Sequence, residues 1–384
     1  DLVCYHYSHG VLFFTNIKPK FDSFVQSNKK EAYYICIVKK ESLIQAFCQL
    51  GEVLRNVGEN KPWDSFKIGV TQDEYDQFIK LIGTLRHHNG WFTEEMIRKA
   101  FLNLGSSLEK KKLDNWSAKY EFTQEPKTVA VIMAGNIPLV GFHDFLCVLL
   151  SGHRVMAKMS SEDDKLLPVI ADFLICFYPE VAKFISFSDR NMKGFDAVIA
   201  TGSNTSFVHF EQYFSKYPHI FRKNRTSVAV LDGKETEAEL LALGNDVFDF
   251  FGRGCRSVSH LILPDSYNIN KVFEHIVNQG AVINNKKYGN NYDYNKAVHL
   301  MNQEKLLDNN FVLLKESDTL SSPLGMLYYH FYKNTDEVDL YLQKHADAIQ
   351  CHIGVNGIPF GNAQCPALND YADNLDTMQW LNAL

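Results

Sequence analysis

A regular alternation of strand-forming and helix-forming segments begins at residue 128, and it most restricts the folds open to this chain. Residues 128–133 have the pattern of a buried strand, and after a short turn residues 139–150 have the apolar content of a helix. A second strand at residues 154–158 and a second helix at residues 162–177 repeat the order. Strands and helices that alternate in this way favour a parallel sheet with helices on both faces. We therefore predict an α/β fold with a doubly wound, Rossmann-type unit.

The alternation continues to the end of the chain, and helical spacing of apolar residues also precedes it. Further strands are predicted at residues 184–187, 196–200, 227–231, 258–263, 311–314, 325–332 and 348–353. One helix is predicted to begin at residue 41, and another to follow the turn at residues 201–204 and end at 214. Further helices are predicted at 71–85, at 93–108 with Thr93 as N-cap, and at 235–251, 269–279, 295–307 and 336–345. The predicted domains are an unassigned extension (1–39), a dinucleotide-binding domain (40–231), a catalytic domain (232–352) and a tail packed at the domain interface (353–384).

Composition narrows the class of protein. A chain of 384 residues is long enough for two domains, and a net charge of −6 argues against a nucleic-acid-binding surface. No run of about eighteen apolar residues occurs, so we expect no membrane span. The eight cysteines form no CxxC pair and no metal-ligand spacing, which favours reduced thiols, a cytoplasmic location and no bound metal.

One of these cysteines stands in a loop suited to chemistry. Residues 251–258 read Phe-Gly-Arg-Gly-Cys-Arg-Ser-Val, so Cys255 lies among glycines and two arginines, just before a predicted strand. Positive charge nearby is expected to lower the pKa of a thiol, and glycines leave room for a substrate. The alternative is that Cys255 is a small buried core residue.

Two further loops follow predicted strands. Asn136 lies in the first of them, and the alternative to a catalytic role is that it caps a helix beginning at Pro138. Residues 201–203 (Thr-Gly-Ser) form the second, which opens a helix at a strand end and is therefore typical of phosphate or nicotinamide binding. The alternative is that this glycine serves turn geometry alone.

In chain order, four segments resemble the aldehyde dehydrogenase superfamily, and more closely its acyl-CoA reductase branch, which includes the LuxC-like fatty-acid reductase of bacterial luminescence. These are Asn-Ile-Pro at 136–138, Lys158, Ala-Thr-Gly-Ser at 200–203 and Gly-Cys-Arg at 254–256, and the resemblance covers about residues 41–384. It implies an aldehyde-dehydrogenase-like fold with Cys255 as the catalytic nucleophile. It also implies that the Asn136 amide and the cysteine's own N–H stabilise the oxyanion.

The resemblance also implies which residues bind the cofactor. Lys158 would reach the adenosine ribose, and Thr201, Gly202 and Ser203 would lie beside the diphosphate and nicotinamide. Ser161 stands where NAD-preferring members carry a glutamate, and a hydroxyl there would accept a 2′-phosphate. NADPH is therefore the expected cofactor and NADH the alternative. Lys158 could instead extend into solvent from a strand end without a ligand.

Two positions depart from the superfamily pattern. The glutamate that activates water in hydrolytic members falls on Val230, which cannot act as a base, although Asp232 or Glu235 could replace it. The glutamate that holds the nicotinamide ribose falls on Thr319. The first departure favours reduction of an acyl-enzyme over its hydrolysis, and the second leaves open a catalytically inactive partner subunit.

The predicted reaction is reduction of an acyl-CoA or acyl-protein thioester to an aldehyde by NADPH. The alternatives are a hydrolytic aldehyde dehydrogenase and a cysteine acyltransferase or thioesterase on the same scaffold. Besides the thioester, a homo-oligomer or an acyl-transferring partner protein is expected. Cys365, close to Pro-Phe-Gly-Asn at residues 359–362, is the rival nucleophile, and His143 is expected to be a packing residue.

Overall fold

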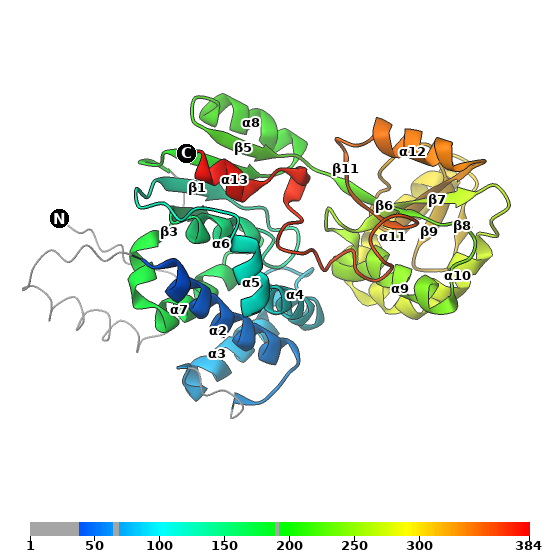
Figure 1. The fold of residues 1–384 in the computed structure, drawn as a ribbon. Coiled ribbons are helices and arrows are strands. Elements are labelled where there is room, and N and C mark those ends of the chain that lie inside the picture. The colour runs from blue at the N-terminus through cyan, green and yellow to red at the C-terminus, as the bar shows by residue number, and fades with distance from the viewer. Residues whose placement is uncertain (1–37, 64–68, 189–191) are drawn as a thin grey trace, which may run out of the picture.

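The first sheet confirms the predicted Rossmann-type unit. The computed structural model describes residues 38–63, 69–188 and 192–384 and places them in two lobes, each built on one sheet (Figure 1). In the first lobe, here called the nucleotide lobe, the strand order is β3-β2-β1-β4-β5 and all neighbours are parallel. Its strands are β1 (Thr128–Ile132), β2 (Arg154–Lys158), β3 (Ile185–Phe187), β4 (Ala197–Thr201) and β5 (His219–Arg222). The short strand β5 was not predicted.

The second sheet forms the core of the other lobe, here called the catalytic lobe. Its order is β11-β6-β7-β10-β9-β8, with parallel pairs except for β8 against β9. Its strands are β6 (Thr226–Val230), β7 (Val258–Pro264), β8 (Leu307–Asp308), β9 (Leu313–Glu316), β10 (Met326–Tyr332) and β11 (Ile349–Gly354). Because β6 belongs to this sheet, the domain boundary predicted at residue 231 is wrong, and the chain crosses between lobes at residues 223–225.

Helices cover both sheets (Figure 1). Those of the nucleotide lobe are α2 (Lys40–Gly58), α3 (Gln72–Thr84), α4 (Glu94–Ser107), α5 (Lys110–Ser117), α6 (Phe142–Leu150), α7 (Leu166–Phe177) and α8 (Asn204–Phe214). Those of the catalytic lobe are α9 (Glu237–Phe248), α10 (Asn270–Ile276), α11 (Lys286–Met301) and α12 (Thr335–Lys344), and the tail ends in α13 (Thr377–Asn382). The predicted extension, 1–39, lies outside the described residues except for its last two.

Helix starts follow local capping where a cap is present. Thr93 accepts a hydrogen bond from Met96 N–H at 3.3 Å, so the predicted N-cap of α4 is confirmed. Asn285 accepts bonds from the N–H groups of Lys287 and Tyr288, and α11 accordingly begins before the predicted residue 295.

Two helices of the nucleotide lobe begin later than predicted. Helix α6 starts at Phe142, because Leu139 has a positive φ of 59° that cannot belong to an α-helix. Asp163 was expected in the first turn of α7, but its carboxylate instead accepts a hydrogen bond from Leu139 N–H at 2.7 Å. The segment before α7 therefore holds the turn after β1.

Helices α2 and α4 pack closely at two glycines. A Cβ on Gly105 would lie 2.8 Å from the carbonyl oxygen of Gly51, so no larger residue fits there. Arg55 donates to the carbonyl of Gly105, and Arg98 of α4 donates to the carbonyl of Val57. These contacts fix α4 firmly to the rest of the nucleotide lobe.

The tail runs from the catalytic lobe back to the nucleotide lobe (Figure 1). The Asp246 carboxylate of α9 accepts hydrogen bonds from the N–H groups of Gly361 and Ala363, at 2.6 and 2.9 Å. Further on, Trp116 of α5 donates to the Tyr371 hydroxyl at 2.8 Å, and α13 packs against α6. The tail is thus bound to both lobes.

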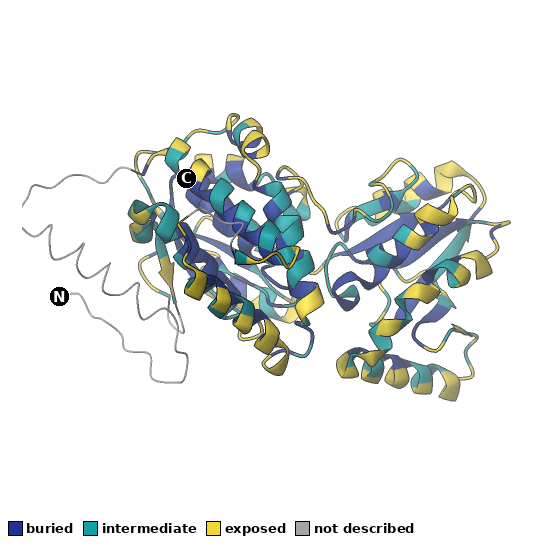
Figure 2. Cartoon of the chain, turned by 90° about the horizontal axis from the view of Figure 1, so that it is seen from below, coloured by how far each residue is buried: buried dark blue, intermediate teal, exposed yellow. Residues whose placement is uncertain are grey.

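Both lobes have a buried interior around their sheet (Figure 2). One ion pair lies inside it: Arg222 at the end of β5 is 3% exposed and donates two bonds to the Asp144 carboxylate and one to Thr377. Hydrogen bonds to both partners compensate the cost of burying these charges. The pair connects β5, α6 and the tail.

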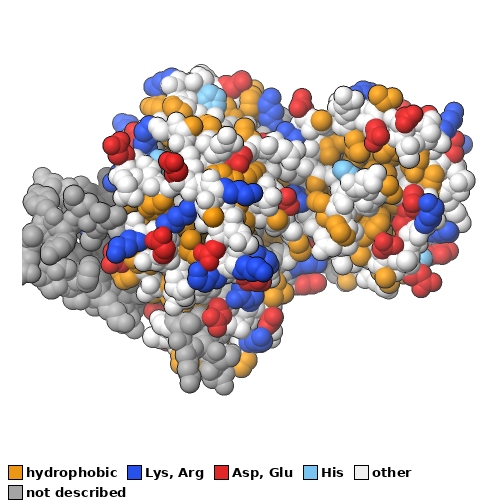
Figure 3. All heavy atoms as spheres, viewed as in Figure 1, with side chains coloured by type: hydrophobic (Ala, Val, Ile, Leu, Met, Phe, Trp, Pro, Cys, Tyr) orange, Lys and Arg blue, Asp and Glu red, His pale blue; other side chains and the backbone are white. Residues whose placement is uncertain are grey.

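On the face shown in Figure 3, acidic and basic side chains are interspersed over the described part of both lobes. In residues 38–63, 69–188 and 192–384, no helix meets the length and apolarity that a membrane crossing demands. The same residues contain no group of three His, Cys, Asp or Glu side chains arranged to bind a metal ion.

Candidate active site

A cavity of about 970 Å³ lies between the two lobes. It is bordered by the segments that follow β1, β2 and β4, by one face of α4, by the loop at residues 252–256 and by the tail around Pro366. The carboxyl ends of β1 and β4 mark the point where the strand order reverses, which is where ligands bind in open α/β sheets. Its volume is within the range of small-molecule and cofactor sites.

Asn136 and Cys255 both border this cavity, although they lie far apart in sequence. The Asn136 amide donates a hydrogen bond to the carbonyl of Arg253 at 2.7 Å and so contacts the cysteine loop directly. The alternative that Asn136 caps a helix is wrong, because α6 begins at Phe142 with Gly141 as N-cap. An amide has two N–H groups, and this bond uses one of them.

The cysteine loop follows a turn with unusual backbone geometry. Phe250, Phe251 and Gly252 have φ values of 53°, 58° and 72°, so two phenylalanines adopt the left-handed conformation that favours glycine. Such residues cost about 1–3 kcal/mol each and persist only when the surroundings hold them. Here Phe251 packs against Trp91, with ring centroids 5.6 Å apart, and both phenylalanines are buried.

Hydrogen bonds hold the loop itself on two sides. The Ser257 hydroxyl accepts bonds from Gly254 N–H at 3.2 Å and from the Gln364 side chain at 3.0 Å. Ser227 donates to the carbonyl of Cys255 at 3.0 Å. Gln364 was not identified from the sequence, because a glutamine in an irregular tail carries no local signal of its contact.

The charge around Cys255 does not act as the sequence predicted. Burial raises the pKa of the Cys255 thiol, and the positive charge of Arg256 offsets this only in part. The predicted net lowering of the pKa is therefore wrong. Arg253 is engaged elsewhere: its guanidinium lies 4.7 Å above the Trp91 ring and 3.2 Å from the Glu162 carboxylate.

Replacing Arg256 with Met should slow the alkylation of Cys255 by iodoacetamide. Without the opposing charge, the pKa of Cys255 rises further. Since only the thiolate reacts and its fraction grows as pH rises through the pKa, the rate profile should move to higher pH. Rates measured from neutral to alkaline pH test this, with Arg256→Lys as the charge-preserving control. A profile that does not move in Arg256→Met would contradict the prediction.

Four of the five predicted cofactor residues border the cavity, namely Lys158, Thr201, Gly202 and Ser203. Gly202 is confined, because a Cβ there would lie 2.8 Å from Ser206. Ser203 caps α8 by accepting a bond from Ser206 N–H. The fifth, Ser161, is exposed and lies outside the lining, and its neighbour Ser160 borders the cavity instead.

The position of the hydrolytic base is occupied by a core residue. Val230 is 2% exposed and packs with Val228 and Ile262, outside the cavity lining. The two alternative bases also lie outside it: Glu235 accepts bonds from the N–H groups of Asp232 and Gly233, and Asp232 accepts one from Lys234.

The carboxylates that do border the cavity already have partners. Asp144 pairs with Arg222, Glu162 with Arg253 and Asp373 with Arg225, and Asp370 accepts a bond from Ala367 N–H. Each of these four carboxylates is therefore already engaged with a neighbouring group.

The sequence analysis also singled out Thr319, Cys365 and His143. Thr319 is outside the lining and its carbonyl pairs with His260, whereas Ser321 and Ser322 of the same segment border the cavity. Cys365, the rival nucleophile, is exposed, lies outside the lining and donates to Asn103 at 3.5 Å. His143, expected to be a packing residue, also borders the cavity, and its ring Nε2 lies 3.0 Å from the carbonyl oxygen of Leu368.

One face of α4 was missed as part of the site. Ala100, Asn103, Leu104 and Ser107 follow the spacing of a single helix face, and all four border the cavity. The spacing could have been read from the sequence. The sequence could not show that this face would lie against the other lobe.

The sequence profile of the acyl-CoA reductase (LuxC) family matches residues 90–309. No curated protein matches the chain in sequence.

Solved structures that resemble the chain are aldehyde dehydrogenases. Aldehyde dehydrogenase 21 of Physcomitrella patens, in complex with the reaction product succinate, is 12% identical with a TM-score of 0.55, over 82% of this chain and 76% of that one. An acetylating aldehyde dehydrogenase of Geobacillus thermoglucosidasius is 12% identical with a TM-score of 0.51, over 87% and 80%. An indole-3-acetaldehyde dehydrogenase complexed with NAD⁺ is 14% identical with a TM-score of 0.50, over 76% and 73%. At these identities the likeness shows the fold.

Proposed function

This chain belongs to the LuxC family of acyl-CoA reductases, and from that premise we propose that it converts an acyl-CoA or acyl-protein thioester to an aldehyde through an acyl group on Cys255. The observation that carries the proposal is that Cys255 and Asn136 border one cavity with the β4–α8 turn. An enzyme of this family is an oxidoreductase, so the thiol and the cofactor segment must meet at one substrate.

The first step is transfer of the acyl group. The Cys255 thiolate attacks the thioester carbonyl, the bond to the carrier sulfur breaks, and the carrier leaves as its thiol after taking up a proton. The negative charge that develops on the carbonyl oxygen requires hydrogen-bond donors. The second N–H of Asn136 and the backbone N–H of Cys255 are the proposed donors.

The second step returns Cys255 to its free form. The cavity has the volume of a cofactor site, and the residues that border it suit a nicotinamide cofactor. Gly202 leaves the turn after β4 without a side chain, and a larger residue would not fit there. Lys158 offers a positive charge, and Thr201 and Ser203 offer hydrogen bonds. When bound, NADPH supplies a hydride to the acyl carbon, and NADH is the alternative donor. With a solvent proton, the aldehyde leaves and the Cys255 thiol is restored. Water need not be activated, in keeping with a core valine at position 230.

The cofactor preference is a finer proposal. The lysine at the end of β2 and the hydroxyl of Ser160, both at the cavity wall, suit a 2′-phosphate. Position 161 carries a serine, and the neighbouring Glu162, which borders the cavity, is paired with Arg253. Ser161 itself is exposed beside them. The acyl-transferring partner and the homo-oligomer stay predictions.

The proposal predicts that purified protein with dodecanoyl-CoA and NADPH forms dodecanal, NADP⁺ and free CoA in equal amounts. Aldehyde with NADP⁺ but no CoA should form no NADPH, because Val230 occupies the position of the hydrolytic base and cannot activate water. Absorbance of NADPH, a thiol reagent for CoA and chromatography of the aldehyde make the measurement.

Each other outcome points to an alternative. NADPH and acid formed without CoA would identify a hydrolytic aldehyde dehydrogenase. CoA release that proceeds unchanged without a nicotinamide would identify an acyltransferase or thioesterase. A wild-type protein that takes up no radiolabelled acyl group would be an inactive partner subunit.

A further inference from the structure

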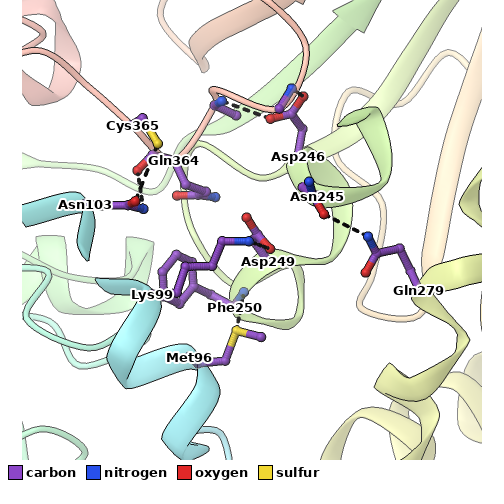
Figure 4. Close-up of polar contacts among 12 residues, drawn as sticks. Met96, Lys99, Asn103, Asn245, Asp246, Asp249, Phe250, Gln279, Gln364 and Cys365 are labelled. Atoms are coloured by element: carbon purple, nitrogen blue, oxygen red, sulfur yellow. Dashed lines mark hydrogen bonds and ion pairs between the residues drawn. The ribbon is translucent and has the colours of Figure 1, made fainter. Parts of the chain in front are cut away.

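Helix α4 of the nucleotide lobe contacts the turn that precedes the cysteine loop (Figure 4). Lys99 forms an ion pair with the Asp249 carboxylate at the start of that turn. One turn of helix earlier, the Met96 sulfur accepts a hydrogen bond from Phe250 N–H at 3.1 Å. Two side chains of one helix thus bind two consecutive residues of the other lobe.

The ion pair between Lys99 and Asp249 is largely shielded from solvent on the Asp249 side. The Asp249 side chain is 11% exposed and the Lys99 side chain 34%. Burial raises the pKa of the Asp249 carboxyl, and the Lys99 charge opposes that shift. Without Lys99 the carboxylate would be partly buried with no cation beside it and would take up a proton more readily.

Asp249 begins a segment whose backbone conformation needs support from its neighbours. It is followed directly by Phe250 and Phe251 in the left-handed conformation, and then by Gly252. A residue in that conformation relaxes unless its neighbours prevent it. Because the Cys255 loop continues from this turn, relaxation would move the sulfur relative to Asn136.

The same helix face continues into the cavity. Asn103, one turn after Lys99, donates to the carbonyl of Gln364 at 3.0 Å, and Gln364 in turn holds Ser257 of the cysteine loop. Since α4 is fixed to α2 by the contacts at Gly51 and Gly105, it is a rigid support. The loop is therefore held from a single helix of the other lobe, directly before it and through Gln364 at its far end. Figure 4 shows the side chains of α4 that make these contacts.

We propose that Lys99 is a positioning residue for Cys255: through Asp249 it holds the left-handed turn at residues 250–252, which sets the sulfur against Asn136 across the domain interface. This inference rests on the proposed function, in that Cys255 is taken as the acylated residue. Lys99 itself lies outside the residues that border the cavity. The expected signature is a slower acylation step with unchanged thioester binding.

The test measures single-turnover transfer of a radiolabelled dodecanoyl group from CoA to Cys255. In Lys99→Met and in Asp249→Asn the rate constant should fall roughly ten- to a hundredfold, the effect of a displaced reacting group. KM for dodecanoyl-CoA should stay unchanged, and Lys99→Arg should restore the rate because it keeps the charge. The double variant should be no slower than either single variant, since both remove the same contact. Lys80→Met, at an exposed lysine of α3, is the matched control and should keep the wild-type rate.

Several results would overturn the inference. One is a wild-type acylation rate in folded Lys99→Met and Asp249→Asn, with folding checked by circular dichroism and thermal melting. Another is a loss that Lys99→Arg does not restore, or a rise in KM alone. Failure of both variants to fold would make the ion pair a structural requirement and would also refute a positioning role. Absence of label on wild-type Cys255 would refute the proposed function instead, so the two failures are distinguishable.

Discussion

Replacing Cys255 with Ala should abolish acyl uptake from acyl-CoA and reduce thioester reduction by on the order of 10⁴-fold or more, as removal of a catalytic nucleophile does in other enzymes. The physical reason is that the covalent intermediate can no longer form, and among the described residues that border the cavity Cys255 is the only cysteine. Labelling with radiolabelled dodecanoyl-CoA and NADPH oxidation give the two measurements.

The other thiols provide matched controls. Cys365→Ala should keep full labelling and full activity, because Cys365 lies outside the cavity lining and its thiol is hydrogen-bonded to Asn103. Two results would make Cys365 the nucleophile instead. One is that the label is found on Cys365 in wild-type protein, and the other is that Cys365→Ala loses activity while Cys255→Ala retains it.

The second large effect is expected at Asn136. Asn136→Ala should lower kcat by about 10²–10³-fold, equivalent to about 2.7–4 kcal/mol of transition-state stabilisation, because an N–H donor to the developing oxyanion is lost. Asn136→Asp should lose as much, since a carboxylate of the same shape accepts where the amide donated. Steady-state and single-turnover kinetics with dodecanoyl-CoA measure the effect.

A structural role for Asn136 must be separated from a catalytic one, because its amide also donates to the carbonyl of Arg253. Alkylation of Cys255 by iodoacetamide is a displacement that forms no oxyanion. If Asn136 stabilises the oxyanion, alkylation should proceed near the wild-type rate while acylation falls. Parallel loss of both reactions would mean that Asn136 only holds the loop.

Patterns of short range in the sequence predicted much of the fold. The buried-strand runs at residues 128–133 and 258–263, the Thr93 cap and the glycine turn at Gly202 all appear in the structure near their predicted places. Each depends on residues within a few positions of one another, through strand alternation, side-chain-to-backbone caps or turn geometry. The roles of Cys255 and Asn136 were predicted differently, from the order in which several loops resemble those of the aldehyde dehydrogenase superfamily, and they stay predictions.

Features that depend on distant neighbours were not predicted, and some were predicted wrongly. Strand β6 was assigned to the first domain because its own residues are those of any buried strand, and only its pairing with β7 and β11 places it in the second sheet. Helix α6 begins later than predicted, because the N–H of Leu139 donates a hydrogen bond to Asp163, which lies in another segment.

The properties of the site itself follow the same division. Two arginines beside Cys255 in sequence suggested a lowered thiol pKa, yet burial by segments far along the chain raises it. Nothing near Lys99 indicates that it would meet Asp249, 150 positions later. Capping, periodicity and the order of loops are local and can be read from the chain, whereas desolvation and contacts between lobes depend on which surfaces folding brings together.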